Sequence, residues 1–294
     1  MKPIIALIRL IVFSNIFVAI CATALTHLSY IFLDLTKAHN APVLIVVFCS
    51  TYFIYNIQRI VRMSYDKLIG KNIGVRLSWI VRNRIALFLS SIILMVVAAI
   101  ALFFVKSASF LTVLPLGIIS ILYVTPFIPL KGKWISLRRV PFIKIFIIAI
   151  IWAIVTVALP FINEFGFSNF DDNNFQLTLL TRFLFVFAIT LPFDIRDLDD
   201  DCDNHVKTIP AVIGKKTTVI LSETLLLFYL GMKFYQFNVL DQIDIAQFIA
   251  ISISIAITIL IVAFAAKKRS ELYYSGLIEG TMLLLHFGVL VLEY

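Results

Sequence analysis

Charged residues are scarce in this chain. Only 14% of its 294 residues are Asp, Glu, Lys or Arg, and 61% are hydrophobic. A soluble domain contains about 25% charged and roughly 45–50% apolar residues. A water-soluble fold of this length cannot hide so much apolar surface, so the composition excludes a soluble globular protein and predicts an integral membrane protein.

Cysteine is also rare, and a cleavable leader is not evident. Cys21, Cys49 and Cys202 show no paired spacing. The first two lie in apolar runs and the third in a segment that we expect to face a reducing compartment, so we predict no disulfide. The first apolar run lacks a small-residue cleavage site after a short apolar region, and we expect it to be retained as a membrane span.

Long apolar runs recur along the whole sequence. About twenty apolar residues cross a hydrocarbon core of about 30 Å as a helix, and a helix satisfies its backbone hydrogen bonds internally. We therefore predict an all-α fold, a multi-pass transmembrane bundle of nine helices, with residues 1–294 forming a single transmembrane domain. The predicted spans are 7–32, 42–63, 85–105, 110–124, 141–162, 177–198, 219–237, 245–266 and 277–292.

Basic residues are concentrated in every second predicted loop. The opposite loops contain only Lys37 and Lys106, and the loop from 163 to 176 is acidic. The positive-inside rule then places the N-terminus in the cytoplasm and the C-terminus outside, most simply in a bacterial plasma membrane. The net charge of +8 is explained by loops that face anionic lipid, and no nucleic-acid partner is expected. The basic loop residues are Lys67, Lys71, Arg76, Arg82, Arg84, Lys131, Lys133, Arg138, Arg139, Lys207, Lys215, Lys216, Lys267, Lys268 and Arg269.

An acidic cluster follows the sixth predicted span. If that span continues as a helix, Asp194, Asp197 and Asp201 share one face, because positions three, four and seven residues apart lie on the same side. Three carboxylates on one face can hold a cation, and Mg²⁺ suits oxygen ligands that share it with substrate phosphates. The alternative is a solvated acidic loop. Against it, Asp194 lies close to the hydrocarbon boundary, where an ionised group is costly without a partner.

Here the sequence resembles the UbiA superfamily of intramembrane prenyltransferases. The segment Arg196-Asp197, Asp201, Lys207-Thr208-Ile209-Pro210 and Gly214 is similar to the second aspartate motif of that family. The resemblance implies nine helices and two aspartate-rich motifs at the cytoplasmic ends of helices two and six, which bind Mg²⁺ and an isoprenyl diphosphate. It also implies transfer of the prenyl group to an aromatic or lipid-like acceptor, with Asp194, Asp197 and Asp201 as the metal-binding and catalytic residues.

The first motif of the family is degenerate in this chain. Asn56 matches its asparagine, but its aspartate positions fall on Ile57, Ile60 and Ser64. In their place Asn56 and Arg59 share one side of the helix, and Arg62 lies near its margin. A guanidinium binds phosphate through paired hydrogen bonds, so our hypothesis is that Arg59 and Arg62 neutralise the diphosphate in place of one metal ion. The alternative is that both anchor the helix end at lipid headgroups.

Further basic and aromatic residues are candidates for the same site. Lys133, Arg138, Arg139, Lys144 and Lys207 are candidate diphosphate ligands, each also explained as a topology-setting charge. Lys144 is the best placed of them, because it lies within an apolar span and must snorkel or face a polar cavity. Aromatic faces attract cations, and the predicted substrate-cavity residues are Tyr52, Tyr55 and Tyr123.

Two other functions share features with prenyl transfer. CDP-alcohol phosphotransferases also bind metal and diphosphate through membrane aspartates, but their Asp-Gly-x-x-Ala-Arg opening is absent. With one motif eroded, a catalytically silent UbiA-like protein that binds isoprenoid or metal, or a carrier, stays open. Carriers often break their helices with Gly or Pro near the midplane, whereas here these residues lie chiefly in loops and at span ends.

Overall fold

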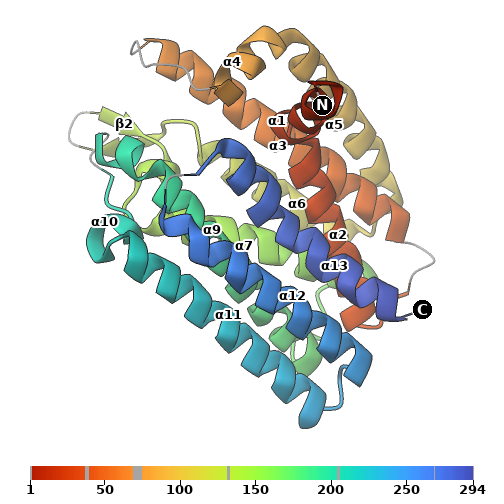
Figure 1. Ribbon diagram of the computed structural model, residues 1–294. Coiled ribbons are helices and arrows are strands. Elements are labelled where there is room, and N and C mark those ends of the chain that lie inside the picture. Colours follow the sequence, from red (N-terminus) through yellow and green to blue (C-terminus); the bar gives the residue numbers. More distant parts are fainter. Residues whose placement is uncertain are drawn as a thin grey trace.

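The computed structural model describes residues 2–36, 40–68, 75–130, 133–203, 206–267 and 269–293. Within these ranges, the side chains of residues 2–5, 62–68, 128–130, 133–134 and 292–293 are not described. Long helices run side by side through most of the molecule (Figure 1). The helical segments that build the bundle are α1 (Lys2–Phe13), α2 (Ile16–Phe32), α3 (Asn40–Leu68), α5 (Arg84–Ala101), η2 (Leu102–Phe104), α6 (Ser107–Leu122), α7 (Ile143–Ala153), η4 (Ile154–Ala158), α8 (Leu159–Phe165), α9 (Asn173–Asp203), α11 (Lys215–Asn238), α12 (Ile245–Ala263), η5 (Phe264–Ala266), η6 (Tyr273–Ile278) and α13 (Glu279–Glu293).

Every predicted span has a helical counterpart in the described residues. Within the described ranges, seven helical stretches are long and apolar enough to cross a membrane. The pair α1 and α2 forms an eighth span if it is counted as one, and α6 is a shorter apolar helix at the position of the predicted fourth span. The predicted all-α transmembrane bundle is therefore confirmed, and the chain is an integral membrane protein.

The first span is bent, which the sequence did not predict. Its two parts, α1 and α2, meet at 62°. Asn15 lies between them with φ 66°, in the left-handed region that Asn tolerates better than most residues. The Asn15 amide donates to Asn56 Oδ1 at 3.0 Å, and its own Oδ1 accepts from Arg76 at 2.9 Å. Buried polar contacts to two other elements therefore hold the bend.

Five short elements connect the spans, and none of them was predicted. They are α4 (Val75–Arg82), β1 (Ile128–Leu130), β2 (Lys133–Ile135), η3 (Leu137–Arg139) and α10 (Ile209–Ile213). The two strands pair antiparallel, with Ile128 opposite Ile135. The Phe142 backbone N–H donates to the Lys207 carbonyl at 3.2 Å, which joins the start of α7 to the segment before α10.

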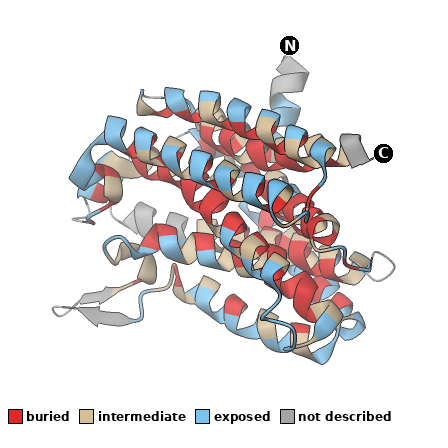
Figure 2. Ribbon diagram, turned by 90° about the horizontal axis from the view of Figure 1, so that it is seen from below, coloured by how far each residue is buried: buried red, intermediate tan, exposed pale blue. Residues whose placement is uncertain are grey.

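Helix α9 lies at the centre of the bundle. It packs against α7 on one side and α11 on another, and 78% of its apolar window is buried, the largest share of any candidate span. Buried residues face the inside of the bundle and exposed residues face outward (Figure 2). Exposed apolar side chains such as Phe103 and Val291 suit a lipid-facing surface. The C-terminal turns of α9 thus extend from the core of the bundle to its charged end.

The bend gives a prediction about stability. We expect Asn15→Ala to lower the free energy of unfolding more than Asn15→Gly does. Both variants lose the contacts to Asn56 and Arg76, but only alanine also meets the steric cost of a left-handed backbone, about 1–2 kcal/mol. The measurement is reversible unfolding of the detergent-solubilised protein, followed by circular dichroism. Equal losses in the two variants would show that the bend does not depend on this backbone conformation.

Candidate functional site

Three carboxylates of α9 converge on one ammonium group of α7. The Lys144 Nζ atom lies 2.6 Å from Asp194 Oδ1, 3.0 Å from Asp201 Oδ2 and 3.9 Å from Asp197 Oδ2. Lys144, Asp194 and Asp201 are all buried. Spacings of three and four residues place the carboxylates, here called the carboxylate cluster, on the same face of α9. Lys144 in the first turn of α7 faces them because α7 packs along α9.

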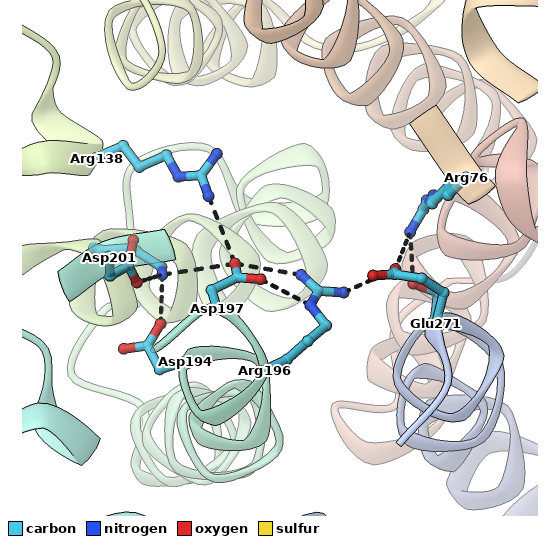
Figure 3. Close-up of polar contacts among 9 residues, drawn as sticks. Arg76, Arg138, Asp194, Arg196, Asp197, Asp201 and Glu271 are labelled. Carbon is cyan, nitrogen blue, oxygen red and sulfur yellow. Dashed lines mark hydrogen bonds and ion pairs between the residues drawn. The ribbon is translucent and has the colours of Figure 1, made fainter. Parts of the chain in front are cut away.

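Arginines surround the carboxylate cluster. Arg196 Nε donates to Asp197 Oδ1 at 2.8 Å, and Arg138 Nη2 lies 3.5 Å from Asp197 Oδ2. Arg196 also reaches Glu271 at 3.4 Å, and Glu271 lies 4.0 Å from Arg76 of α4 (Figure 3). Opposite charges thus alternate from η3 across α9 to α4. Buried carboxylates require such partners, because an unpaired charge away from water is strongly destabilising.

Arg138 lies in η3, outside the membrane spans. Partial burial by itself would lower the pKa of its guanidinium. Tyr123, Asp197 and Asp201 act in the opposite direction, and the pKa lies above its ordinary value. Arg138 is therefore a permanent positive charge at the edge of the carboxylate cluster.

A cavity of about 200 Å³ opens beside the carboxylate cluster. The charged part of its wall comes from α3, η3, α7, α9 and α13, and most of the remainder is apolar. A compartment with charged groups at one end and aliphatic walls beyond them suits a ligand with a charged head and an apolar tail. The charged lining residues are Arg59, Arg138, Lys144, Asp194, Arg196, Asp197 and Glu279, and the uncharged polar ones include Gln58, Ser120 and Thr190; the apolar ones include Val18, Ile147, Ile148, Ile151, Val186 and Ile189.

The structure brings several of the predicted site residues together at this cavity, here called the first cavity. Seven of the residues singled out from the sequence line it: Tyr55, Arg59, Tyr123, Arg138, Lys144, Asp194 and Asp197. Asp201 lies just behind them, against Lys144. These residues come from α3, the end of α6, η3, α7 and α9, five segments that are distant in sequence.

Other predicted site residues are placed elsewhere. The Tyr52 hydroxyl lies 2.8 Å from Ser90 Oγ of α5, and Tyr52 does not line the first cavity. The Asn56 amide donates to the carbonyls of Ser14 and Tyr52, so this side chain joins α3 to the bend before α2. Tyr52 was assigned from the helix face and Asn56 from its match to the first motif, and both lie on a part of α3 that packs against protein.

The remaining basic candidates divide into two groups. Lys207 is exposed, and neither it nor Arg139 lines the first cavity. Arg62 and Lys133 lie outside the residues whose side chains the structure describes. Among the basic candidates, Arg59, Arg138 and Lys144 are therefore the ones placed at the cavity.

Three of the lining residues that were not sequence-based candidates can form specific polar contacts: Glu279, Arg196 and Trp152. Glu279 is an acidic residue inside a predicted span, which is itself a signal of function. In the sequence, Arg196 was considered only as part of the aspartate motif. A basic residue directly next to Asp197 is itself a signal that the two side chains form an ion pair. Trp152 gave no signal in the sequence. Its Nε1 donates to the Tyr55 hydroxyl at 3.2 Å, a contact between α7 and α3 that only the fold creates.

The donor types of the carboxylate cluster fit a divalent metal. Three carboxylates from one helix face are ordinary ligands for Mg²⁺. The point at which they converge is, however, held by the Lys144 ammonium. In the described part of the chain, no group of three or more His, Cys, Asp or Glu side chains is arranged to hold a metal ion. A metal therefore fits this cluster only when Lys144 has moved away.

The fold resembles that of solved UbiA structures. A UbiA homologue from Archaeoglobus fulgidus bound to GPP and Mg²⁺ matches with a TM-score of 0.63 at 15% identity, over 97% of this chain and all of that one. A structure described as digeranylgeranylglyceryl phosphate synthase matches with a TM-score of 0.59 at 17% identity, over 99% and 98% of the two chains. The apo structure of a homologue from Aeropyrum pernix K1 gives a TM-score of 0.56 at 14% identity, over 97% and 96%.

These likenesses establish the fold. No family model and no curated protein matches the sequence. The chain is thus an intramembrane helical protein with the UbiA fold, as the second aspartate motif and the number of spans predicted.

The position of Lys144 gives a prediction about metal binding. We expect Lys144→Met to bind Mn²⁺, a probe for Mg²⁺, at least tenfold more tightly than the unmodified protein does when no diphosphate is present. Removal of the ammonium vacates the point of convergence and leaves Asp194 and Asp201 without the counter-charge that lies 2.6 and 3.0 Å from them. Electron paramagnetic resonance of free Mn²⁺ in titrations of purified protein measures the affinity.

The matched control for this titration is Lys215→Met, which removes an exposed lysine of α11. It should leave Mn²⁺ affinity unchanged. If the unmodified protein binds Mn²⁺ as tightly as Lys144→Met does, Lys144 does not compete with a metal.

Proposed function

We propose that this protein is an intramembrane prenyltransferase of the UbiA type. It moves a prenyl group from an isoprenyl diphosphate to a lipophilic acceptor, either an aromatic ring or a lipid-like alcohol. The observation that carries the proposal is the first cavity, where an apolar wall continues from a cluster of carboxylates and basic groups. The similar Archaeoglobus fulgidus homologue is described as bound to GPP and Mg²⁺.

The charged end of the first cavity suits a diphosphate. Arg59, Arg138 and Lys144 approach it from three different elements. Guanidinium groups pair with phosphate oxygens through two parallel hydrogen bonds. Arg59 stands on the helix that lacks the first aspartate motif, so it supplies positive charge where relatives with that motif would hold a metal ion.

The reaction requires the departing diphosphate to be stabilised. The carbon–oxygen bond of the donor breaks, and the diphosphate leaves with the electron pair. The acceptor forms the new bond to the allylic carbon and loses a proton. Fixed positive charges at the place where negative charge develops lower the barrier. Tyr55, Tyr123 and Trp152 present aromatic groups to the same cavity, and aromatic faces stabilise a developing allylic cation.

Mg²⁺ is the proposed cofactor, held by Asp194, Asp197 and Asp201. When bound, it would act as a Lewis acid on the phosphate oxygens. Lys144 is drawn toward the diphosphate and leaves the carboxylates to the metal, so the two ligands favour each other's binding. Metal affinity in this chain is therefore coupled to the presence of a diphosphate.

The orientation of the protein is proposed from its charges. The carboxylate cluster lies at the same end of the bundle as the described basic loop residues Arg76, Arg138 and Lys207. On the positive-inside rule this end faces the cytoplasm, with the N-terminus on the same side and the C-terminus outside. We propose one transmembrane domain over residues 1–294 in a plasma membrane.

One observation favours a second candidate function. At the aspartate positions of the first motif, α3 carries Ile57 and Ile60, which cannot ligate a metal. A UbiA-like protein that binds an isoprenyl diphosphate without turning it over would need only the remaining half of the site. Product formation separates this candidate from the enzyme.

The proposed function is tested with the carboxylates. Purified membranes are incubated with radiolabelled isoprenyl diphosphates, a panel of aromatic and lipid-alcohol acceptors, and Mg²⁺ or a chelator. We expect a prenylated product that the chelator abolishes. The double variant Asp197→Asn with Asp201→Asn should lower turnover by about 10²–10³-fold, the usual effect of removing a transition-state electrostatic contact.

Asp241→Asn, at an exposed residue between α11 and α12, is the matched control and should keep full activity. Full turnover in the double variant would exclude these carboxylates from the chemistry. Donor binding without product for any acceptor would favour the silent protein.

The role of Arg59 is tested separately. We expect Arg59→Gln to raise the KM for the donor diphosphate about tenfold, equivalent to about 1.4 kcal/mol of lost binding, because a charged contact to phosphate is removed. Initial rates at varied donor concentration give KM and kcat. Arg84→Gln, at an exposed arginine that begins α5, is the control for a general loss of membrane anchoring. If both variants behave alike, Arg59 only anchors its helix.

A further inference from the structure

A second apolar cavity continues from the first. It encloses about 100 Å³ between α2, α3, α6 and the α7–η4–α8 span. Five residues line both cavities and so form the boundary between them: Ile54, Tyr55, Ser120, Ile151 and Trp152. The remaining wall of the second cavity carries no charged side chain.

The second cavity lies farther from the carboxylate cluster along every helix that the two share. On α7 and its continuation, the first cavity is lined from Lys144 to Trp152, and the second from Ile151 to Leu159. On α3 and α6 the second cavity is likewise displaced away from the charged end, to residues such as Val46 and Val113. The two cavities are therefore consecutive segments of one apolar path that leads from the charged groups into the bundle.

Two hydrogen-bonded side chains stand at the boundary. Trp152 of α7 donates through Nε1 to the Tyr55 hydroxyl of α3 at 3.2 Å. Trp152 is buried, with 7% of its surface exposed. The pair joins opposite walls of the path, and its polar atoms satisfy each other, which fixes two bulky side chains in place.

From these observations we propose that the Trp152–Tyr55 pair sets the length of the prenyl chain that the protein accepts. This inference rests on the proposed function, because it requires a diphosphate head at the carboxylate cluster. Lys144 and Trp152 are separated by roughly 12 Å of helix at 1.5 Å per residue, which matches the reach of a geranyl chain. Leu159 lies roughly 22 Å from Lys144 by the same measure, a distance suited to a geranylgeranyl chain.

The donor class that follows is a short isoprenyl diphosphate. Its tail fills the first cavity and ends against Trp152 and Tyr55. We expect a longer tail to follow the path only when the pair is removed, because these two bulky, hydrogen-bonded side chains stand at the boundary of the second cavity. The empty space beyond them is a latent extension of the site.

Gly117 offers a clean way to close the second cavity. It lies on α6 in the wall of that cavity and not in the wall of the first. A Cβ atom added at Gly117 meets no atom within 4 Å. The Cβ of a leucine at this position therefore fits without displacing the backbone. We expect the rest of its side chain to occupy the second cavity, which Gly117 lines, and leucine also favours the helix.

The experiment measures binding, so that it needs neither an acceptor nor turnover. Geranyl and geranylgeranyl thiodiphosphates, which resist cleavage, are titrated into the detergent-solubilised full chain with Mg²⁺. We expect the unmodified protein to bind the geranyl compound at least tenfold more tightly. Trp152→Ala should change the ratio of the two affinities at least tenfold in favour of the geranylgeranyl compound. Trp152→Leu, which creates a smaller void and so costs less stability, should change the ratio in the same direction.

Gly117→Leu separates a length limit from a general loosening of the site. Alone, it should leave geranyl affinity unchanged. Combined with Trp152→Ala, it should cancel the gain for the geranylgeranyl compound, because it fills the space that the first substitution opens. This cancellation is expected only if the longer tail enters the second cavity.

Several outcomes would overturn the inference. Equal affinity for both compounds in the unmodified protein, unaffected by Gly117→Leu, would mean that a long tail leaves the first cavity toward lipid. An unchanged ratio in both Trp152 variants would mean that the pair is no barrier. If neither compound binds any variant, the proposed function fails and this inference fails with it.

Discussion

Three carboxylate groups and one ammonium group share a buried space at the charged end of this bundle. Asp194 and Asp201 lie within 3.0 Å of the Lys144 nitrogen, and Asp197 within 3.9 Å. Charges of one sign cannot be gathered in a water-poor space without counter-charges, because both desolvation and mutual repulsion oppose it. Lys144, with Arg138 and Arg196 around Asp197, makes the arrangement possible. It also fixes how the end of α9 faces α7 and η3.

The same arrangement defines what the site can receive. A diphosphate brings negative charge and can replace the carboxylates as the partner of Lys144. A divalent ion can in turn replace Lys144 as the partner of the carboxylates. The two exchanges support each other, so head-group and metal binding belong to a single event. Arg59 adds a fixed positive charge on α3, where the first aspartate motif of the UbiA family is lost. In the function proposed above, Arg59 takes over part of the role of a metal ion.

Beyond the charged groups the described walls of the two cavities are uncharged and mainly apolar or aromatic. The first cavity passes from basic and acidic residues to aliphatic ones, and the second continues with no charge in its wall. This gradient follows from the position of α9, whose C-terminal turns reach the charged end while its middle lies in the core. A ligand with an ionic head and a hydrocarbon tail matches the gradient along its whole length. The boundary at Trp152 and Tyr55 then determines how much tail can be held.

The sequence by itself determined the membrane spans and the face of α9 that carries the carboxylates. Both depend on local regularities: the length of apolar runs and the periodicity of a helix. Only the tertiary structure decided three further features: the bend at Asn15, the contacts of Tyr52 and Asn56 with neighbouring protein, and the pairing of Trp152 with Tyr55. The partner of the carboxylate cluster was decided there too, since Lys144 lies on another helix, distant in sequence. A helix face can be read from residue spacing, but what lies opposite that face depends on how the helices pack, and one sequence contains no local signal for that.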